Sequence, residues 1–133
     1  MNEDWERGIG TSIRRGIGAL MGHANRPSAA MIMLCDQPMV TAAVLGRLLS
    51  EYGKGGSAVV TAGYEETLGP PVVVGAEFFP ALLSLPDDRG AKGIWLGHPE
   101  RVHRVECPEA GMDLDTPEDY ARLLQDRSAD AGQ

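Results

Sequence analysis

Two acidic clusters hold the side chains of this sequence that are best suited to chemistry. Asp36 follows directly after the apolar run 29–35, and Asp113 and Asp115 stand on either side of one leucine near the C-terminus. If residues 113–115 are extended, Asp113 and Asp115 point to the same side of the chain. Mg²⁺ is typically held by one or two carboxylates together with substrate phosphates. Convergence of the two clusters would therefore build a magnesium site for phosphoryl or nucleotidyl transfer.

Simpler interpretations of individual residues stay open. Asp36 serves equally well as a turn residue before Pro38, and Asp119 fits the role of a helix-cap partner better than that of a metal ligand. Cys35 belongs to an apolar run and has no evident catalytic partner, so we expect a packed thiol. A soft-metal site is not indicated, because the histidines show no ligand spacing (His23, His98 and His103).

The apolar pattern predicts alternating strands and helices around Asp36. A strand over 29–35 fits burial on both faces, as in a parallel sheet. A helix follows from an N-cap at Thr41 to about Gly53. A strand over 58–62 completes a strand–helix–strand unit, whose crossover is right-handed in nearly all known cases. Asp36 then lies beyond the carboxyl end of a strand, where ligands bind in open α/β sheets.

Further elements are predicted on both sides of this unit. A helix over 13–21, with Thr11 or Ser12 as its N-cap, precedes it. Gly16 and Gly18 weaken that helix unless they allow close packing against a strand or a ligand. Downstream, the pattern predicts in order a loop over 64–71, a strand over 72–74, a helix over 78–83, a short helix over 91–96, a strand over 102–105 and a final helix over 116–124.

Composition and charge exclude several classes of partner. The 133 residues suit one domain and include 19 acidic and 12 basic side chains, for a formal net charge of −7. Nucleic acids and anionic membrane surfaces bind clusters of positive charge, and this chain is acidic, so we expect neither as a partner. No apolar run approaches the roughly 18 residues of a membrane-spanning helix. Two cysteines and an acidic N-terminus indicate a reducing, cytoplasmic compartment.

Four segments, taken together, resemble one protein family. They occur in the family's order and spacing, and the resemblance extends from about Gly10 to Leu124. Most informative is the combination of CDQP with DLDTPED, since either motif alone would be weak. The sequence is similar to the MobA-like nucleotidyltransferases, and most to their molybdenum cofactor cytidylyltransferase branch, through GTSIRRGI at 10–17, AAMIMLCDQPMVT at 29–41, DDRGAK at 87–92 and DLDTPEDY at 113–120.

This resemblance implies a fold and a reaction. The implied fold is a Rossmann-like three-layer α/β sandwich of the nucleotidyltransferase type. The implied reaction transfers CMP or GMP from CTP or GTP to a molybdopterin-type acceptor, with Mg²⁺ as cofactor and pyrophosphate as product. In such proteins the metal ligands correspond to Asp36 and Asp115, with Asp113 close behind.

The resemblance also implies which residues meet the substrates. Ser12, with Gly10 beside it, corresponds to the lining of the base and ribose pocket. Gln37 is expected near the nucleotide, and the turn over 87–92 is expected to face the acceptor.

The sequence departs from the family pattern in two places. The family's opening strand and Gly-rich loop, whose backbone amides cradle the triphosphate, have no counterpart in residues 1–9. In addition, LGPP at 68–71 stands where relatives commonly have Gly-His-Pro, so Pro70 cannot donate a hydrogen bond as that histidine could.

The first departure leads to several expectations. We expect residues 1–133 to form a single domain, the C-terminal portion of a longer enzyme without its first strands, with flexible ends at 1–9 and 127–133. An apolar sheet edge beside 31–35 would then be exposed and could pair with a second copy or with the missing part of the enzyme. We also expect negligible turnover from this chain alone, since one phosphate-loop donor contributes roughly 3–4 kcal/mol in the transition state.

Two other functions fit the same residues. One is a different nucleotidyltransferase of the superfamily, acting on a sugar phosphate or a methylerythritol phosphate. The other is a non-catalytic protein that keeps the fold for binding or assembly.

Overall fold

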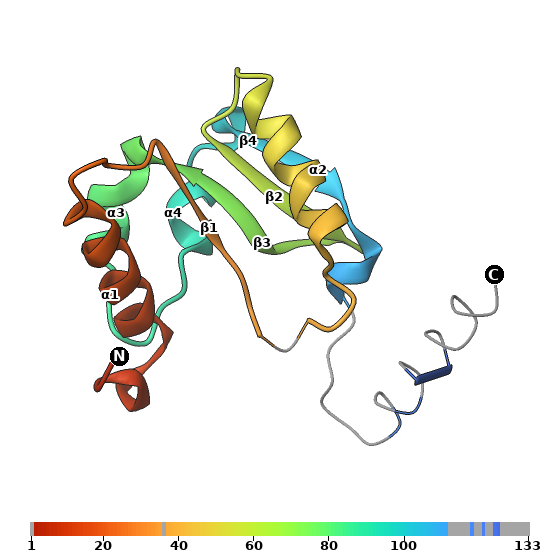
Figure 1. Ribbon diagram of the computed structural model, residues 1–133, viewed down its shortest axis with the longest axis horizontal. Coiled ribbons are helices and arrows are strands. Elements are labelled where there is room, and N and C mark those ends of the chain that lie inside the picture. The colour runs from red at the N-terminus through yellow and green to blue at the C-terminus, as the bar shows by residue number, and fades with distance from the viewer. Residues whose placement is uncertain (1, 36, 112–117, 119–120, 122–123, 126–133) are drawn as a thin grey trace.

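The computed structural model describes residues 2–35, 37–111, 118, 121 and 124–125. The described chain contains both helices and strands (Figure 1). Short 3₁₀ helices, labelled η, join several of the longer elements. In order, the elements are η1 (Trp5–Arg7), α1 (Ile9–Met21), β1 (Ala29–Ile32), α2 (Ala42–Gly53), β2 (Val59–Tyr64), β3 (Thr67–Gly75), η2 (Ala76–Phe78), α3 (Phe79–Leu83), α4 (Lys92–Leu96), η3 (Pro99–Arg101), β4 (Val102–Glu106) and η4 (Pro108–Gly111).

The four strands of the described residues form one mixed sheet in the order β1-β3-β2-β4. β3 runs antiparallel to both β1 and β2, whereas β4 runs parallel to β2. β1 and β2 therefore point in the same direction, with α2 as the crossover between them and β3 inserted in the middle. The predicted strand–helix–strand unit is confirmed, but its two strands are not neighbours.

β1 is shorter than predicted and lies at the edge of the sheet. The expectation of a strand over 29–35, buried on both faces of a parallel sheet, is wrong. β1 ends at Ile32, which pairs with Val72 of β3. The next residues along β3 are Pro71 and Pro70, which have no N–H for a ladder. Cys35, expected to be a packed thiol, is exposed beyond the strand.

Two helical layers cover the sheet, which confirms the three-layer α/β architecture. α1, α3 and α4 pack on one face around a core that includes Val59, Val74 and Leu82. α2 covers the other face, where Leu48 packs against Val60 and Val73. Figure 1 shows α1 and α3 on one side of the strands and α2 on the other.

α1 begins earlier than predicted because a turn approaches its first residues closely. The helix starts at Ile9 with Gly8 as its N-cap, at a φ of 138° that favours glycine. Thr11, one of the two predicted caps, lies inside the helix and donates from Oγ1 to the carbonyl oxygen of Gly8 at 2.7 Å. A Cβ on Gly10 would lie 1.9 Å from the carbonyl oxygen of Pro86. The start of α1 is therefore shaped by the 86–90 turn.

Gly16 and Gly18 have no such packing role among the described residues. A Cβ on either of them would meet no atom within 4 Å. The predicted reason for tolerating them, close packing against a strand or a ligand, is therefore not seen within the described chain.

The segment 64–71 forms a hairpin rather than the predicted loop. β3 begins at Thr67, so Glu65 and Glu66 make the turn, with Glu65 at a φ of 54°. Arg104 on β4 supports this turn by donating to the carbonyl oxygens of Glu65 at 2.8 Å and Thr67 at 3.3 Å. A side chain 39 residues away thus supplies the order that local sequence did not predict.

The predicted helices over 42–53, 78–83 and 91–96 and the predicted strand over 102–105 are confirmed within a few residues. Glu118, Ala121 and Leu124 are helical, and most of the predicted final helix lies outside the described residues. The described part of the chain contains no helix that is both long and apolar enough to span a membrane.

Candidate functional site

A pocket of about 390 Å³ opens at the end of the sheet where β1 and β2 finish. Its walls come from the first turns of α1, the exit of β1, the start of β3 and α4. Most of the lining side chains are apolar, and Lys92 carries the charge among the described lining residues. The lining residues are Ile9, Ile13, Ile32, Leu34, Tyr64, Thr67, Leu68, Gly69, Pro70, Val72, Gly90, Ala91, Lys92 and Trp95. A pocket of this volume suits a small-molecule ligand.

Beside this pocket, Gln37 connects three segments that are distant in sequence. Its side-chain Nε2 donates to the carbonyl oxygen of Pro70 on β3 and to that of Ala110 in η4, both at 2.8 Å. The residue is only 6% exposed. Gln37 directly follows Asp36, and Ala110 precedes Asp113 by three residues. The backbone flanking both predicted acidic clusters therefore meets at one place.

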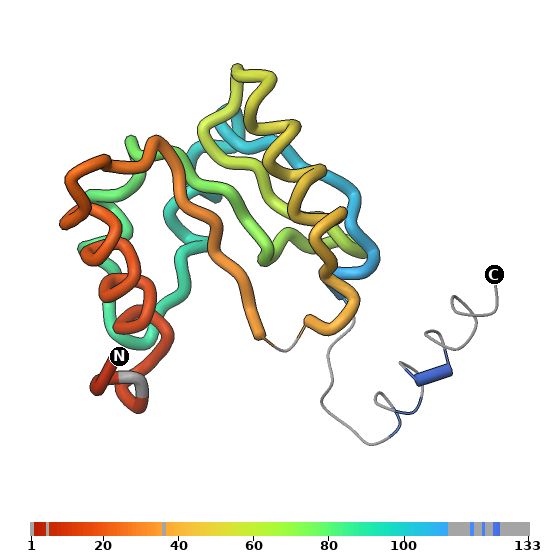
Figure 2. The backbone as a smooth tube through the Cα atoms, in the orientation of Figure 1, coloured from red at the N-terminus to blue at the C-terminus, as the bar shows by residue number. Residues whose placement is uncertain are grey.

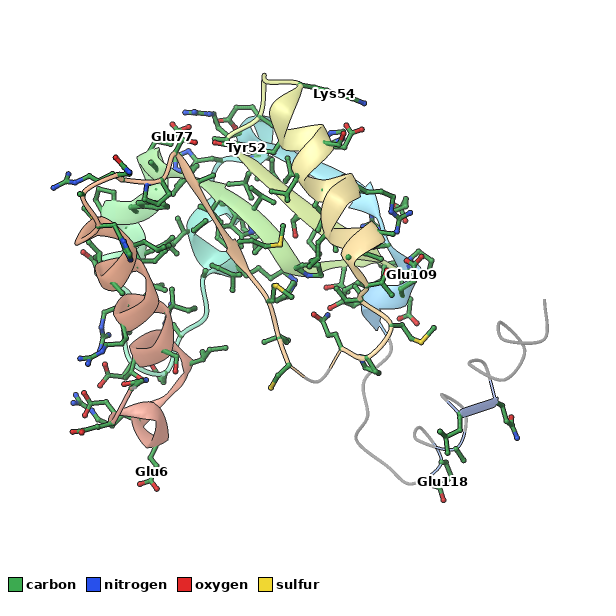
Figure 3. The ribbon with its side chains drawn as sticks, in the orientation of Figure 1. Glu6, Tyr52, Lys54, Glu77, Glu109 and Glu118 are labelled. Carbon is green, nitrogen blue, oxygen red and sulfur yellow. The ribbon has the colours of Figure 1, made fainter. Side chains whose placement is uncertain are left out.

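η4 is held in this place by further contacts. The Cys107 N–H donates to the carbonyl oxygen of Gly63 at 2.8 Å, and Arg47 of α2 reaches Glu109 at 3.3 Å. Figure 3 shows Glu109 near the N-terminal end of α2. Burial raises the pKa of the Cys107 thiol, which is thus an uncharged core group.

The three predicted metal ligands, Asp36, Asp113 and Asp115, lie outside the described residues. Within the described part of the chain, no group of three or more His, Cys, Asp or Glu side chains could hold a metal ion. A buried oxygen nevertheless suits the chemistry of a cation site. Gln37 Oε1 has no hydrogen-bond partner among the described residues. An oxygen acceptor of this kind can bind a hydrated divalent cation or a donor group of a ligand.

The predicted nucleotide residues Gly10 and Ser12 lie in the first turns of α1. Ser12 is exposed and accepts a hydrogen bond from the Asn2 side chain at 2.9 Å. Gly10 is buried, and its N–H donates to the carbonyl oxygen of Asp87 at 2.9 Å. Ile9 and Ile13, which flank these residues, line the pocket. Figure 2 shows that the N-terminal residues fold back beside the N-terminal end of α1.

The turn over 87–92 joins α1 to the pocket. Asp87 forms ion pairs with Arg14 at 2.5 Å and with Arg7 at 2.6 Å. The hydrogen bond from Arg14, helped by the charges of Arg14 and Arg7, holds the pKa of Asp87 below its usual value. At the other end of the turn, Lys92 donates from Nζ to Thr67 Oγ1 at 3.1 Å. The two ion pairs of Asp87 thus hold one end of the turn against α1, and the ammonium group of Lys92 lies at the pocket at the other end.

Two parts of this site were not predicted from the sequence. Trp95 is buried against the pocket, and Thr67 supports Lys92 from the hairpin that was predicted to be a loop. A signal for Lys92 existed, because the chain has only two lysines and this one follows a turn. No local signal pointed to the contacts of Gln37, since they join residues 33 and 73 positions apart.

Comparison with known proteins points to one family. A family model described as a MobA-like NTP transferase domain matches residues 1–102. Among curated proteins, none gives a significant match.

Three solved mycobacterial structures are similar to this chain. Rv0371c from Mycobacterium tuberculosis H37Rv is 27% identical with a TM-score of 0.66, and the match covers 87% of this chain and 59% of that one. The Rv0371c complex with manganese is 30% identical with a TM-score of 0.59, over 86% of this chain and 59% of that one. A homologue of Rv0371c from Mycobacterium sp. strain JC1 is 28% identical with a TM-score of 0.62, over 83% and 55%. The chain therefore spans between 55% and 59% of the length of these relatives.

Proposed function

Because the chain belongs to the MobA-like NTP transferase family, we propose that it contributes the metal and acceptor sites of a nucleotidyltransferase. The reaction we propose transfers CMP or GMP from CTP or GTP to a molybdopterin-type acceptor and releases pyrophosphate. The observation that carries this proposal is the meeting of three segments at Gln37, beside a pocket at the carboxyl end of β1. Ligands of open α/β sheets bind at such an edge.

We assign Asp36 and Asp115 to the divalent cation, with Asp113 close to them. Support comes from the hydrogen bond that Gln37, the residue after Asp36, donates to Ala110, three positions before Asp113 in the sequence. The buried Oε1 of Gln37 suits a hydrated cation, and a similar structure contains manganese. When bound there, a divalent cation would neutralise phosphate charge and align the groups for in-line displacement.

The first turns of α1 would bind the nucleotide through Ser12. Its hydroxyl is exposed, so a ribose or base can reach it and replace the hydrogen bond from Asn2. The N–H of Gly10 is already used by the 86–90 turn, so Gly10 would shape this end of the helix rather than donate to the ligand.

The pocket is the proposed acceptor site. Its apolar walls would cover the ring system of the acceptor, and the Lys92 ammonium group would meet a phosphate at the entrance. This assignment agrees with the expectation that the 87–92 turn faces the acceptor.

The test is binding of Mn²⁺ and of Mg²⁺ with CTP or GTP to the 133-residue protein, measured by titration calorimetry. Asp36→Asn and Asp115→Asn should each weaken Mn²⁺ binding about tenfold or more, since even supporting residues of metal sites contribute 10–100-fold. Glu100→Gln, which removes an exposed carboxylate before β4, is the matched control and should leave the affinity unchanged. Equal Mn²⁺ affinity in the parent and both aspartate variants would refute the assignment.

A further inference from the structure

We infer that Thr67 is a positioning residue that holds the Lys92 ammonium group at the pocket as the binding group for a phosphate of the acceptor. The inference rests on the proposed function in taking this pocket as the acceptor site. It deepens that function in two ways. A phosphate on the acceptor becomes a requirement for tight binding, and a hydroxyl group on the β2–β3 hairpin becomes the feature that sets this requirement.

Both ends of the Lys92 side chain are fixed by the fold. Its backbone lies between Ala91 and Trp95, which are 6% and 4% exposed and belong to the core on the α1 face of the sheet. Its Nζ donates to Thr67 Oγ1 at 3.1 Å, from 25 residues away in sequence. An unrestrained lysine side chain samples many rotamers, so a ligand loses affinity by ordering it. The contact with Thr67 reduces that loss, because part of the order exists before the ligand binds.

The ammonium group keeps hydrogen-bonding capacity for a ligand. It has three N–H donors, and Thr67 accepts from one of them. Among the described residues, Lys92 forms no ion pair, whereas the other lysine of the chain, Lys54, is paired with Glu51 at 2.7 Å. A threonine hydroxyl is neutral and leaves the charge of its partner intact. Within the described part of the chain, the Lys92 charge is thus ordered without being neutralised, which suits a group that binds an anion.

Thr67 is itself fixed by three strands. It lies opposite Tyr64 at the tip of the β2–β3 hairpin. Arg104 of β4 donates to the carbonyl oxygens of Glu65 and Thr67. The Arg104 side chain lies across Gly63 of β2, where a Cβ would be 2.3 Å from Arg104 Nε. The Thr67 hydroxyl group is therefore attached to a well-supported backbone and offers a fixed point to the ammonium group.

The rest of the pocket favours a ring attached to that phosphate. Trp95 and Tyr64 line it together with aliphatic side chains, in a volume of about 390 Å³. Glu65 and Glu66 of the hairpin turn are exposed and are not among the described lining residues, so Lys92 sets the sign of the charge there. A phosphomonoester carries about −1.5 to −2 charges at pH 7 and gains more from a fixed ammonium group than a carboxylate does.

Titration calorimetry of the 133-residue protein with two pairs of probes tests the inference. Hydroxymethylpterin phosphate is compared with hydroxymethylpterin, and methylumbelliferyl phosphate with methylumbelliferone. We expect the parent protein to bind each phosphate about tenfold or more tightly than its phosphate-free counterpart, as is typical of hydrogen bonds to charged groups.

Four variants assign this preference to the two residues. Lys92→Met should abolish the preference for the phosphate and leave the affinity for the phosphate-free probes unchanged. Thr67→Val, which keeps the shape of the side chain and removes the hydroxyl group, should reduce the preference about threefold or more. Thr67→Ser restores the hydroxyl group and should restore the preference, which a purely structural role of Thr67 would not predict. Lys54→Met removes the other lysine and is the matched control, expected to bind all four probes as the parent does.

The outcomes separate this inference from the proposed function. The expected pattern with the methylumbelliferyl pair, together with no binding of either pterin, would refute the proposed acceptor and support the phosphate site. A parent protein that binds Mn²⁺ but shows no preference for phosphate, or binds none of the four probes, would refute the inference and leave the proposed metal site standing. Equal preference in Thr67→Val and the parent, or no recovery in Thr67→Ser, would refute the positioning role. Equal losses in Lys54→Met and Lys92→Met would refute the assignment to Lys92.

Discussion

Alanine substitutions at Gly10 and Gly16 should change stability in opposite directions, although both residues lie in α1. At Gly10 the new Cβ would lie 1.9 Å from the carbonyl oxygen of Pro86 and 3.0 Å from that of Arg89. These are backbone atoms, so no side-chain rotation relieves the clash. The helix and the 86–90 turn must move apart.

The magnitude follows from three contributions. Overpacking of this kind costs about 1–3 kcal/mol. Separation of the turn also weakens the hydrogen bond from the Gly10 N–H to Asp87, with a net value of about 1 kcal/mol. The better helix propensity of alanine returns up to about 1 kcal/mol. Gly10→Ala should therefore destabilise the protein by about 2 kcal/mol.

Gly16→Ala is the matched control because its new Cβ would meet no described atom within 4 Å. Only helix propensity then acts, and the variant should gain about 0.5–1 kcal/mol. Urea unfolding followed by far-ultraviolet circular dichroism measures both free energies. Gly10→Ala as stable as the parent protein, or Gly16→Ala less stable than it, would contradict this prediction.

Three further predictions concern other parts of the molecule. Because the pKa of Asp87 is lowered in the folded protein, the ionised carboxylate stabilises the fold at pH values above the usual aspartate pKa, near 4. This stabilisation is lost as the pH falls through the lower folded-state pKa. Asp87→Asn should therefore reduce the fall of melting temperature at acid pH, and an unchanged fall would contradict this prediction. Leu48→Ala should cost about 2–5 kcal/mol, since the Leu48 side chain of α2 is fully buried against the sheet. Leu49→Ala, at the exposed neighbour, should change stability by no more than about 0.5 kcal/mol, and urea unfolding measures both variants. Among the described residues, β1 has no strand on its outer edge, and this edge should let the 133-residue chain self-associate. The mass from light scattering should then rise with concentration, and a clean monomer at high concentration argues against edge pairing.

Local patterns in the sequence determined most of the elements of this fold. α2 has the predicted length, from its N-cap Thr41 to Gly53, because apolar residues at helical spacing are a signal that lies within the segment itself. The same local information predicted α3, α4 and β4. The motifs CDQP and DLDTPED, read together, predicted the family that the comparison then showed.

Only the tertiary structure decided how these elements meet. Insertion of β3 between β1 and β2, the support of the hairpin by Arg104 and the close approach at Gly10 all depend on residues distant in sequence. The contacts of Gln37 show the physical reason. Its neighbours in sequence predict a turn beside a metal ligand, whereas its amide partners are backbone carbonyls that folding brings from 33 and 73 residues away. Backbone carbonyls are present at every residue, so no pattern of side chains marks the two that Gln37 selects.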